Sequence, residues 1–368
     1  MDFAAAAALR GLRGLVRTVD WLTFPLYLED CLALANPLWS VREPRGRVEA
    51  VRRETPDATT LVVRPGWGWR GHLPGQYVRV GVELDGVLHW RPYSLTSPPG
   101  AHGGRVSITV KATPDGRVSR HLAHRTTVGT VLRLGPAQGR LVLGRRPPGR
   151  LLFLTAGSGI TPVMGVLRTL VARGGPADVV MVHSAPTRQD VIFGAELREL
   201  AARCPGFRLH EHFTRGGAGT RPRLAMAEVA ELCPDWRERE TWACGPAGML
   251  DDAERHWNRH GRADSLRMER VRPVLPPLAG GTEKEGRVRF IRSGAEAEAD
   301  AVTPLLAVGE SIGLVMPSGC RMGICFGCVV PLRYGKVRDL RTGWLHGEEG
   351  DLIQTCVSAA AGPVAIEL

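Results

Sequence analysis

Four cysteines place the tightest constraint on how this chain of 368 residues can fold. Cys320, Cys325 and Cys328 follow the spacing C-x4-C-x2-C, and Cys356 stands alone 28 residues later. In a chain of this length such a spacing indicates metal ligands rather than a disulfide framework. The sequence therefore predicts a tight loop that a distant segment approaches, so that four sulfur atoms reach one metal centre.

The spacing of the cysteines also helps to distinguish between two kinds of metal site, a structural zinc site and an iron–sulfur cluster. Structural zinc sites usually pair two short C-x2–4-C segments, and zinc is the alternative here. Three clustered thiolates and one remote thiolate are instead the ligand pattern of a plant-type [2Fe–2S] cluster. Gly319, Gly323 and Gly327 fit this cluster, because glycine lets the backbone wrap closely and turn its N–H groups toward sulfide. We predict a [2Fe–2S] cluster, which accepts one electron at a time.

The composition is that of a soluble globular protein in a reducing compartment. Apolar residues make up 43% and charged residues 23%, as in ordinary domains, and clustered unpaired cysteines favour the cytoplasm. The net charge of +11 comes almost entirely from arginine and could suit nucleic acid, an anionic membrane or an acidic protein. No run of six basic residues occurs, so we predict no nucleic-acid partner. No stretch approaches the ~18 uncharged apolar residues of a transmembrane helix.

Residues 1–44 form an extension with a helical pattern. Apolar residues recur at three- and four-residue steps while arginines mark another face, which is typical of an amphipathic helix. Such a helix could pack on the domain that follows. Alternatively, residues 1–35 could lie on an anionic membrane surface, which would make the protein peripheral at the inner face of the cell membrane. The apolar positions are Leu9, Leu12, Val16, Val19 and Leu22, and the arginines are Arg10, Arg13 and Arg17.

Changes in composition divide the rest of the chain into three domains and a linker. Residues 45–147 alternate apolar and polar residues in short runs separated by glycine and proline, which predicts an antiparallel β-barrel or sandwich. Continuous apolar runs alternate with helical patterns over 148–270 and predict a doubly wound parallel α/β sheet. Residues 271–285 lack periodicity and read as a linker. Residues 286–368 form a small domain around the cysteine loop.

A strand of the first domain ends in Arg91-Pro92-Tyr93-Ser94. A guanidinium suits a phosphate, a flat aromatic ring suits the face of a flavin, and a hydroxyl can tune a redox atom beside it. Alone, the motif could be a strand end with a structural tyrosine. Followed by G-R-V-S-R-H-L at 116–122, it resembles the flavin domain of the ferredoxin–NADP reductase superfamily. The resemblance implies that Arg91 holds the flavin phosphate, Tyr93 lies along the isoalloxazine, and Ser94 hydrogen-bonds N5.

The second flavin motif favours FAD over FMN. Backbone N–H groups at a helix start can bind a pyrophosphate, and G-R-V-S-R-H-L would place such a start at the right distance from the first motif. The further FAD-binding residues implied by the resemblance are Pro92, Val110, Lys111, Gly116, Val118 and Ser119.

Two motifs of the α/β domain point to a nicotinamide dinucleotide. A glycine turn after the first parallel strand lets phosphates approach the N-terminus of the next helix, although by itself it is only a tight connection. Cys244-Gly245-Pro246, with Met249, matches the C-G-P-x-x-M element of the same superfamily. The resemblance implies that Cys244 lies near the nicotinamide C4, so that Ser94 and Cys244 are the catalytic pair. The cofactor-binding residues of the glycine turn are Gly157, Ser158, Gly159, Thr161 and Pro162.

The choice between NADPH and NADH depends on the loops after the next two strands. Acidic side chains select NAD, whereas arginine accommodates a 2′-phosphate. Arg188 comes before Asp190 in the first of these loops, and Arg215 lies in the second. We predict NADPH, with NADH and a solvated Arg188 as the alternative.

The order of the domains resembles fused flavin/iron–sulfur reductases that serve oxygenases and desaturases. The segment R-P-G-W-G-W-R-G-H-L-P-G-Q-Y and the A-N-P-L-W-S that precedes it are similar to actinobacterial oxidoreductases that pair with acyl-CoA desaturases. The resemblance implies a route from NADPH to FAD to a C-terminal β-grasp ferredoxin domain and then to a membrane acyl-CoA desaturase. One alternative acceptor is a ring-hydroxylating oxygenase, a P450 or an alkane monooxygenase. An alternative of another class is a non-catalytic iron–sulfur redox sensor.

Overall fold

The computed structural model describes residues 35–40, 44–84, 86–114, 116–175, 178–215, 223–270, 286–318, 323, 326–341 and 343–368. The helix predicted within residues 1–34, the linker at 271–285, and the predicted ligands Cys320 and Cys325 lie outside these ranges. Within them, every helix is too short or too polar to span a bilayer. Short 3-10 helices are η1 (Pro37–Trp39), η2 (His102–Gly104), η3 (Gly157–Gly159), η4 (Arg188–Asp190), η5 (Trp236–Glu238) and η6 (Ala263–Ser265).

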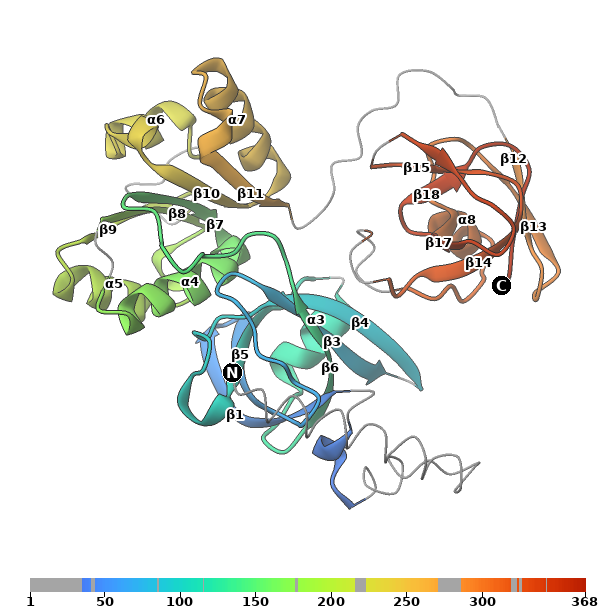
Figure 1. Ribbon diagram of the computed structural model, residues 1–368, viewed down its shortest axis with the longest axis horizontal. Coiled ribbons are helices and arrows are strands. Elements are labelled where there is room, and N and C mark those ends of the chain that lie inside the picture. Colours follow the sequence, from blue (N-terminus) through green and yellow to red (C-terminus); the bar gives the residue numbers. More distant parts are fainter. Residues whose placement is uncertain are drawn as a thin grey trace. The chain divides into compact units, whose positions relative to one another are not determined.

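The first sheet, drawn from blue to teal in Figure 1, is antiparallel and has the strand order β4-β3-β6-β1-β2-β5. Its two edges meet beyond the end of β4. Leu95 bridges Ile108, and the Thr96 N–H donates to the Ser107 carbonyl over 2.8 Å. The sheet thus closes into a barrel, as the alternating sequence predicted. The strands are β1 (Arg45–Thr55), β2 (Ala58–Pro65), β3 (Tyr77–Leu84), β4 (Val87–Ser94), β5 (Val106–Lys111) and β6 (Val131–Gln138).

One short helix, α3 (Arg117–His124), is tied to this barrel. Val118 and Leu122 lie on its buried face. The Thr59 hydroxyl of β2 donates to the Ala123 carbonyl near the end of the helix, over 2.8 Å. The contact fixes the direction in which the helix start points.

The second sheet, drawn in green to gold in Figure 1, is parallel and has the order β11-β10-β7-β8-β9. Apolar side chains of alternate positions, such as Leu154, Val182 and Ala243, pack with α6 and α7 in one buried cluster. The parallel doubly wound prediction is confirmed, with β11 and α6 as additional elements. The elements are β7 (Leu151–Ala156), α4 (Ile160–Ala172), β8 (Val179–Ala185), α5 (Gly194–Arg203), β9 (Phe207–Phe213), α6 (Met226–Leu232), β10 (Glu240–Gly245), α7 (Ala247–Arg259) and β11 (Leu266–Arg270).

The third part, drawn in orange to red, holds a mixed sheet of order β13-β12-β19-β14-β17 and a small sheet of order β16-β15-β18. The strands β12 and β19 pair in parallel although they are far apart in the sequence. Leu305 and Leu306 of α8 enter the core that these strands share. The elements are β12 (Gly286–Phe290), β13 (Ala295–Ala299), α8 (Leu305–Ser311), β14 (Val329–Tyr334), β15 (Val337–Asp339), β16 (Leu345–His346), β17 (Leu352–Gln354), β18 (Ser358–Ala360) and β19 (Val364–Ile366).

Candidate functional site

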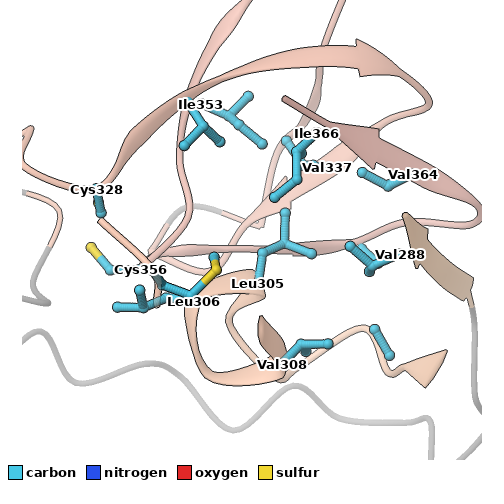
Figure 2. Packing of buried hydrophobic residues seen from close by; sticks show 14 of the residues in the cluster. Val288, Leu305, Leu306, Val308, Cys328, Val337, Ile353, Cys356, Val364 and Ile366 are labelled. Carbon is cyan, nitrogen blue, oxygen red and sulfur yellow. The ribbon is translucent and has the colours of Figure 1, made fainter. Parts of the chain in front are cut away.

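Two of the four predicted cluster ligands, Cys328 and Cys356, are buried at one side of the C-terminal core (Figure 2). Thr355 joins their segments, because its hydroxyl donates to the Cys328 carbonyl over 2.9 Å. The Gly323 N–H donates to the Cys356 sulfur over 3.2 Å. The segments that contain Gly323, Cys328 and Cys356 therefore lie next to one another, as four sulfur ligands of one cluster would require.

Gly323 must be a glycine in this position. Its φ is +70°, and an added Cβ would lie 2.9 Å from both methyl carbons of Val357, so a side chain would meet both strain and a clash. Its carbonyl accepts a hydrogen bond from Arg341 over 2.9 Å. The Asp339 carboxylate that holds Arg341 raises the pKa of this guanidinium, and the sulfurs of Cys356 and Cys328 raise it further.

This environment fits an anionic sulfur-ligated cluster. A backbone N–H directed at sulfur and a fixed cation both stabilise negative charge on sulfur, and burial keeps water away from it. Among the described residues no three His, Cys, Asp or Glu side chains form a metal-binding group. Because two of the four predicted ligands lie outside those residues, the ligand set stays a prediction.

The flavin motif occupies the last four residues of β4. Arg91, Pro92, Tyr93 and Ser94 are all half-buried. Strand geometry places Arg91 and Tyr93 on one face and Ser94 on the other. The Arg91 guanidinium donates to its neighbouring Trp90 carbonyl over 2.9 Å. The motif is therefore continuous and partly accessible, and its contacts with a flavin stay predicted.

The second flavin motif begins α3, with Gly116 as its N-cap. A Cβ at Gly116 would lie 2.1 Å from the Thr113 hydroxyl and 2.2 Å from the Ser119 hydroxyl. The Ser119 hydroxyl itself donates to the Gly116 carbonyl over 3.1 Å. The side chains of this turn are thus occupied with one another, and its first backbone N–H groups are the natural phosphate donors.

Two other predicted flavin residues have structural contacts in the barrel. Val110 is fully buried in β5, and the Lys111 amine pairs with the Asp57 carboxylate over 2.8 Å. Val118 is also buried, so only its backbone could reach a cofactor. Their assignment to FAD stays a prediction.

The two nicotinamide motifs, about 85 residues apart, meet at the carboxyl ends of β7 and β10. An added Cβ on Gly159 would lie 2.1 Å from the Cys244 carbonyl oxygen, so the glycine turn rests directly on the end of β10. A Cβ on Gly245 would similarly meet Met249 Cε at 2.6 Å. The backbone contact at Gly159 requires glycine, whereas the flexible Met249 side chain could move away from a Cβ at position 245. Ser158 and Pro246 are exposed at this edge, whereas Thr161 and Pro162 are buried.

A row of polar residues crosses the same sheet beside this edge. Paired positions in β8, β7, β10 and β11 are His183, Thr155, Cys244 and Glu269. The Thr155 hydroxyl and His183 Nδ1 are 2.8 Å apart. Burial lowers the pKa of His183 to about 4, so this imidazole is neutral. Burial also raises the pKa of Cys244 well above its ordinary value, so its thiol is protonated.

Sequence reasoning missed Glu269. Its Oε2 is buried without a hydrogen-bond partner among the described residues, although the residue as a whole is only half-buried. Burial raises its pKa from the ordinary 4.5 to about 7. The available signal was an acid within the short alternating run L-R-M-E-R, directly before the linker.

Replacing Glu269 with glutamine should increase stability at neutral pH. The folded protein binds the proton of Glu269 more tightly than the unfolded chain does, so its stability falls as pH rises from 4.5 to about 7. Glutamine is neutral throughout, so we expect E269Q to gain up to about 3 kcal/mol over the parent at pH 8 and little at pH 4.5. Burial of the neutral His183 makes stability rise with pH instead. This effect is the same in E269Q and in the parent, so it cancels when their stabilities are compared.

Urea unfolding of both proteins across this pH range measures the gain. Glu231→Gln, which removes an exposed carboxylate on α6, is the matched control. A stability difference that does not change with pH would show that Glu269 is ionised in the folded protein.

The arginines predicted to select NADPH lie in neighbouring loops at the same end of the sheet. The Arg215 N–H donates to the Pro186 carbonyl over 2.7 Å, which ties the loop after β9 to the loop after β8. Asp190 is turned inward, since its carboxylate accepts hydrogen bonds from the Thr187 N–H at 3.0 Å and hydroxyl at 2.6 Å. Arg188 remains 66% exposed. The acid is thus occupied and the arginines face solvent.

The carboxylate of Glu211 is shared between Arg188 and Arg198, so it does not neutralise both arginines. Its carboxylate receives two hydrogen bonds from Arg198, at 2.9 and 2.6 Å, whereas Arg188 lies 3.8 Å away. The described arginines at this edge are Arg188, Arg198 and Arg215, and the described acids are Asp190 and Glu211. Three cations against two acids leave one net positive charge beside the β8 loop, which favours an anionic group there.

Comparison with known proteins identifies two of the three parts. Residues 70–142 match the family described as an oxidoreductase FAD-binding domain, and residues 153–255 match an oxidoreductase NAD-binding domain. The NADPH oxidoreductase of Mycobacterium tuberculosis is 50% identical over 363 residues, covering 97% of this chain and 93% of that protein. The glycine betaine monooxygenase reductase subunit of Chromohalobacter salexigens is 33% identical over 319 residues, covering 80% and 86%.

Among solved structures, phthalate dioxygenase reductase has a similar fold. Its TM-score is 0.57 at 20% identity, and the match covers 88% of this chain and 97% of that chain. Its description is that of a modular structure for electron transfer from pyridine nucleotides to [2Fe–2S]. At this identity the likeness concerns the fold alone.

Proposed function

This chain belongs to the family of FAD- and NAD-binding oxidoreductases, and from that premise we propose that it carries electrons from NADPH through FAD to a [2Fe–2S] cluster and on to a separate, oxygen-activating protein. That it is an NAD(P)H- and FAD-dependent reductase follows from the family itself. The observation that carries the rest of the proposal is the buried pair Cys328 and Cys356, with the Gly323 N–H directed at sulfur.

The proposed domains are 45–147 for FAD, 148–270 for the nicotinamide and 286–368 for a β-grasp ferredoxin domain. The parallel pairing of β12 with β19 and the helix α8 in their shared core support the last assignment. The fold match to phthalate dioxygenase reductase also supports this assignment. The match covers 88% of this chain, so it extends beyond the residues of the first two sheets.

A bound flavin would supply the exchange between a two-electron hydride and single electrons. The residues of this chain would bind and orient. Arg91 would neutralise the flavin phosphate, and the start of α3 would donate backbone N–H groups to the pyrophosphate. Ser94 would place a hydroxyl beside the reacting ring atom. Cys244, a neutral buried thiol, would form an uncharged wall beside the nicotinamide.

We further propose NADPH as the electron donor. The inward capping role of Asp190 and the exposed Arg188 and Arg215 support this choice, since a 2′-phosphate needs cations and no free acid. The relative that is 50% identical is named for NADPH.

The acceptor that we propose is an oxygen-activating enzyme. The relative from Chromohalobacter salexigens is the reductase subunit of a monooxygenase, which supports an oxygenase. A membrane acyl-CoA desaturase, which the sequence resemblance implies, belongs to the same chemical class. Delivery of electrons to a purified oxygenase or desaturase would separate the two. A redox sensor without catalytic turnover is the competing function.

Stopped-flow reduction of the purified full chain tests this function. We expect flavin absorption with iron–sulfur shoulders, rapid bleaching by NADPH, and turnover with cytochrome c as a one-electron acceptor. Flavin without iron–sulfur absorption would contradict the cluster. Rapid bleaching without turnover on any acceptor would favour the sensor.

A further inference from the structure

The segment that follows the flavin motif is held from two sides. The N–H groups of Leu95 and Thr96 both donate to barrel carbonyls over 2.8 Å, and both residues are completely buried. Their carbonyl groups contact α4 instead. This helix begins directly after the glycine turn, and residues 161–175 belong to the same compact unit as these two residues. The same helix thus starts at one cofactor motif and contacts the chain beside Ser94 of the other.

Gly165 brings the backbone of α4 against the Leu95 carbonyl. A Cβ added to Gly165 would lie 2.3 Å from the Leu95 carbonyl oxygen and 3.7 Å from the Thr96 Cα. Both obstacles are backbone atoms, which cannot turn aside as a flexible side chain can. Glycine is disfavoured inside a helix, yet Gly165 stands in the middle of α4. Its presence there is explained by the close backbone contact, which a larger residue would prevent.

Arg168 makes a second contact with the same segment. It lies three residues after Gly165 and therefore on the same face of the helix. The residue is half-buried, and its guanidinium donates to the Thr96 carbonyl over 2.8 Å. Two successive carbonyl groups are thus contacted by one face of α4. Because Leu95 directly follows Ser94 in the chain, a shift of α4 against this segment would be passed on to Ser94.

We propose that Gly165 and Arg168 are positioning residues for flavin reduction, because the backbone that they contact continues directly into Ser94. The proposal rests on the role proposed above for Ser94 beside flavin N5. In that step the C4–H bond of the reduced nicotinamide breaks, and its hydrogen and both bonding electrons form a bond to N5. Oxidised coenzyme and reduced flavin are the products. The rate of such a transfer depends steeply on the distance and alignment of the two reacting atoms.

Anaerobic stopped-flow reduction of the full-length protein with bound flavin tests the proposal. Varying the NADPH concentration separates the limiting rate of flavin bleaching from the apparent Kd for NADPH. We expect Arg168→Ala to lower the limiting rate about tenfold, because a small misplacement of reacting groups has effects of this size, and to leave the Kd unchanged. Arg168→Lys keeps one donor for the Thr96 carbonyl and should recover most of the rate. Gly165→Ala should lower the rate further, and the Arg168 variants decide the proposal whether or not it folds.

A second readout does not depend on catalysis. Amide hydrogen exchange of the peptide that contains Leu95 and Thr96 should become faster in Arg168→Ala. Reduction of the flavin by dithionite should keep the parent rate, because it needs no nicotinamide. Arg173→Ala is the matched control and should behave as the parent does. Arg173 follows α4 and also donates to a carbonyl, that of Gly144 over 3.3 Å, in a segment that is not next to Ser94 in the chain.

Four results would overturn the inference. An unchanged limiting rate in Arg168→Ala, in a parent that NADPH bleaches, would overturn the inference alone. A raised Kd with an unchanged limiting rate would do the same, since it would assign Arg168 to coenzyme binding. An equal loss of rate in Arg173→Ala would indicate a general loosening of α4 rather than positioning of Ser94. A parent that NADPH does not bleach would contradict the proposed function as well.

Discussion

Replacing Cys356 with serine should abolish electron delivery from NADPH to cytochrome c while leaving the reduction of ferricyanide by NADPH unchanged. The proposed cluster needs four thiolates, and Cys356 is the remote one. Ferricyanide can take electrons directly from a reduced flavin, which Cys356 does not touch in this proposal. Serine preserves a partner for the Gly323 N–H, which now donates to sulfur over 3.2 Å, so the loss reports the cluster rather than the fold of the loop.

Iron content, visible absorption and both acceptor activities measure the result. Cys204→Ser is the matched control, because Cys204 is a half-buried thiol in the α/β part and no ligand role is predicted for it. If C356S lost its iron yet kept full cytochrome c reduction, electrons would leave the protein from the flavin. The proposed route through the [2Fe–2S] cluster would then be wrong. If both activities were lost, flavin binding or folding would be affected instead.

Strands with a strong local pattern were predictable from the sequence. Within the part predicted as a parallel α/β sheet, the run F-R-L-H-E-H-F has the same bounds as β9, and the run L-L-F-L-T ends one residue before β7 does. Short apolar runs bounded by turn residues favour buried strands over helices, because most helices are longer. The helix start at Gly116 was likewise predictable, since the glycine and Ser119 mark it.

A short strand with a weaker pattern was missed. The edge strand β11 reads L-R-M-E-R, which alternates apolar and charged residues, and its parallel partner β10 supplies the information that the local sequence lacks. The closure of the barrel could not be predicted from one strand, because the bridge from Leu95 to Ile108 joins segments thirteen residues apart.

The candidate site was predictable in its motifs and not in its chemistry. The spacing of the cysteines singled out Cys328 and Cys356 as ligands, which stays a prediction, and the local sequence placed the glycine turn before a helix. The contact between Gly159 and the end of β10 depends on how two strands align. The buried carboxyl of Glu269 depends on the same alignment, since Cys244 is its partner in the register. Long-range register carries no signature in a single segment.

Replacing both Arg188 and Arg215 with alanine should lower kcat/KM for NADPH by about 10- to 100-fold. A hydrogen bond to a charged group contributes about 1.5–3 kcal/mol, and about 1.4 kcal/mol corresponds to a factor of ten. The value for NADH should change little, because NADH lacks the 2′-phosphate that these arginines would bind. Arg198 keeps the two hydrogen bonds that hold Glu211, so the loops should retain their arrangement in the variant.

Steady-state kinetics with both coenzymes, using ferricyanide as the acceptor, measure the ratio of the two kcat/KM values. Arg203→Ala is the matched control, since its side chain is 76% exposed at the end of α5 and pairs only with Glu199 among the contacts described for it. An equal fall for NADPH and NADH would place the arginines at a part common to both coenzymes, such as the pyrophosphate. An unchanged ratio would mean that neither arginine meets the 2′-phosphate. That result would overturn the assignment of Arg188 and Arg215 as the residues that select NADPH.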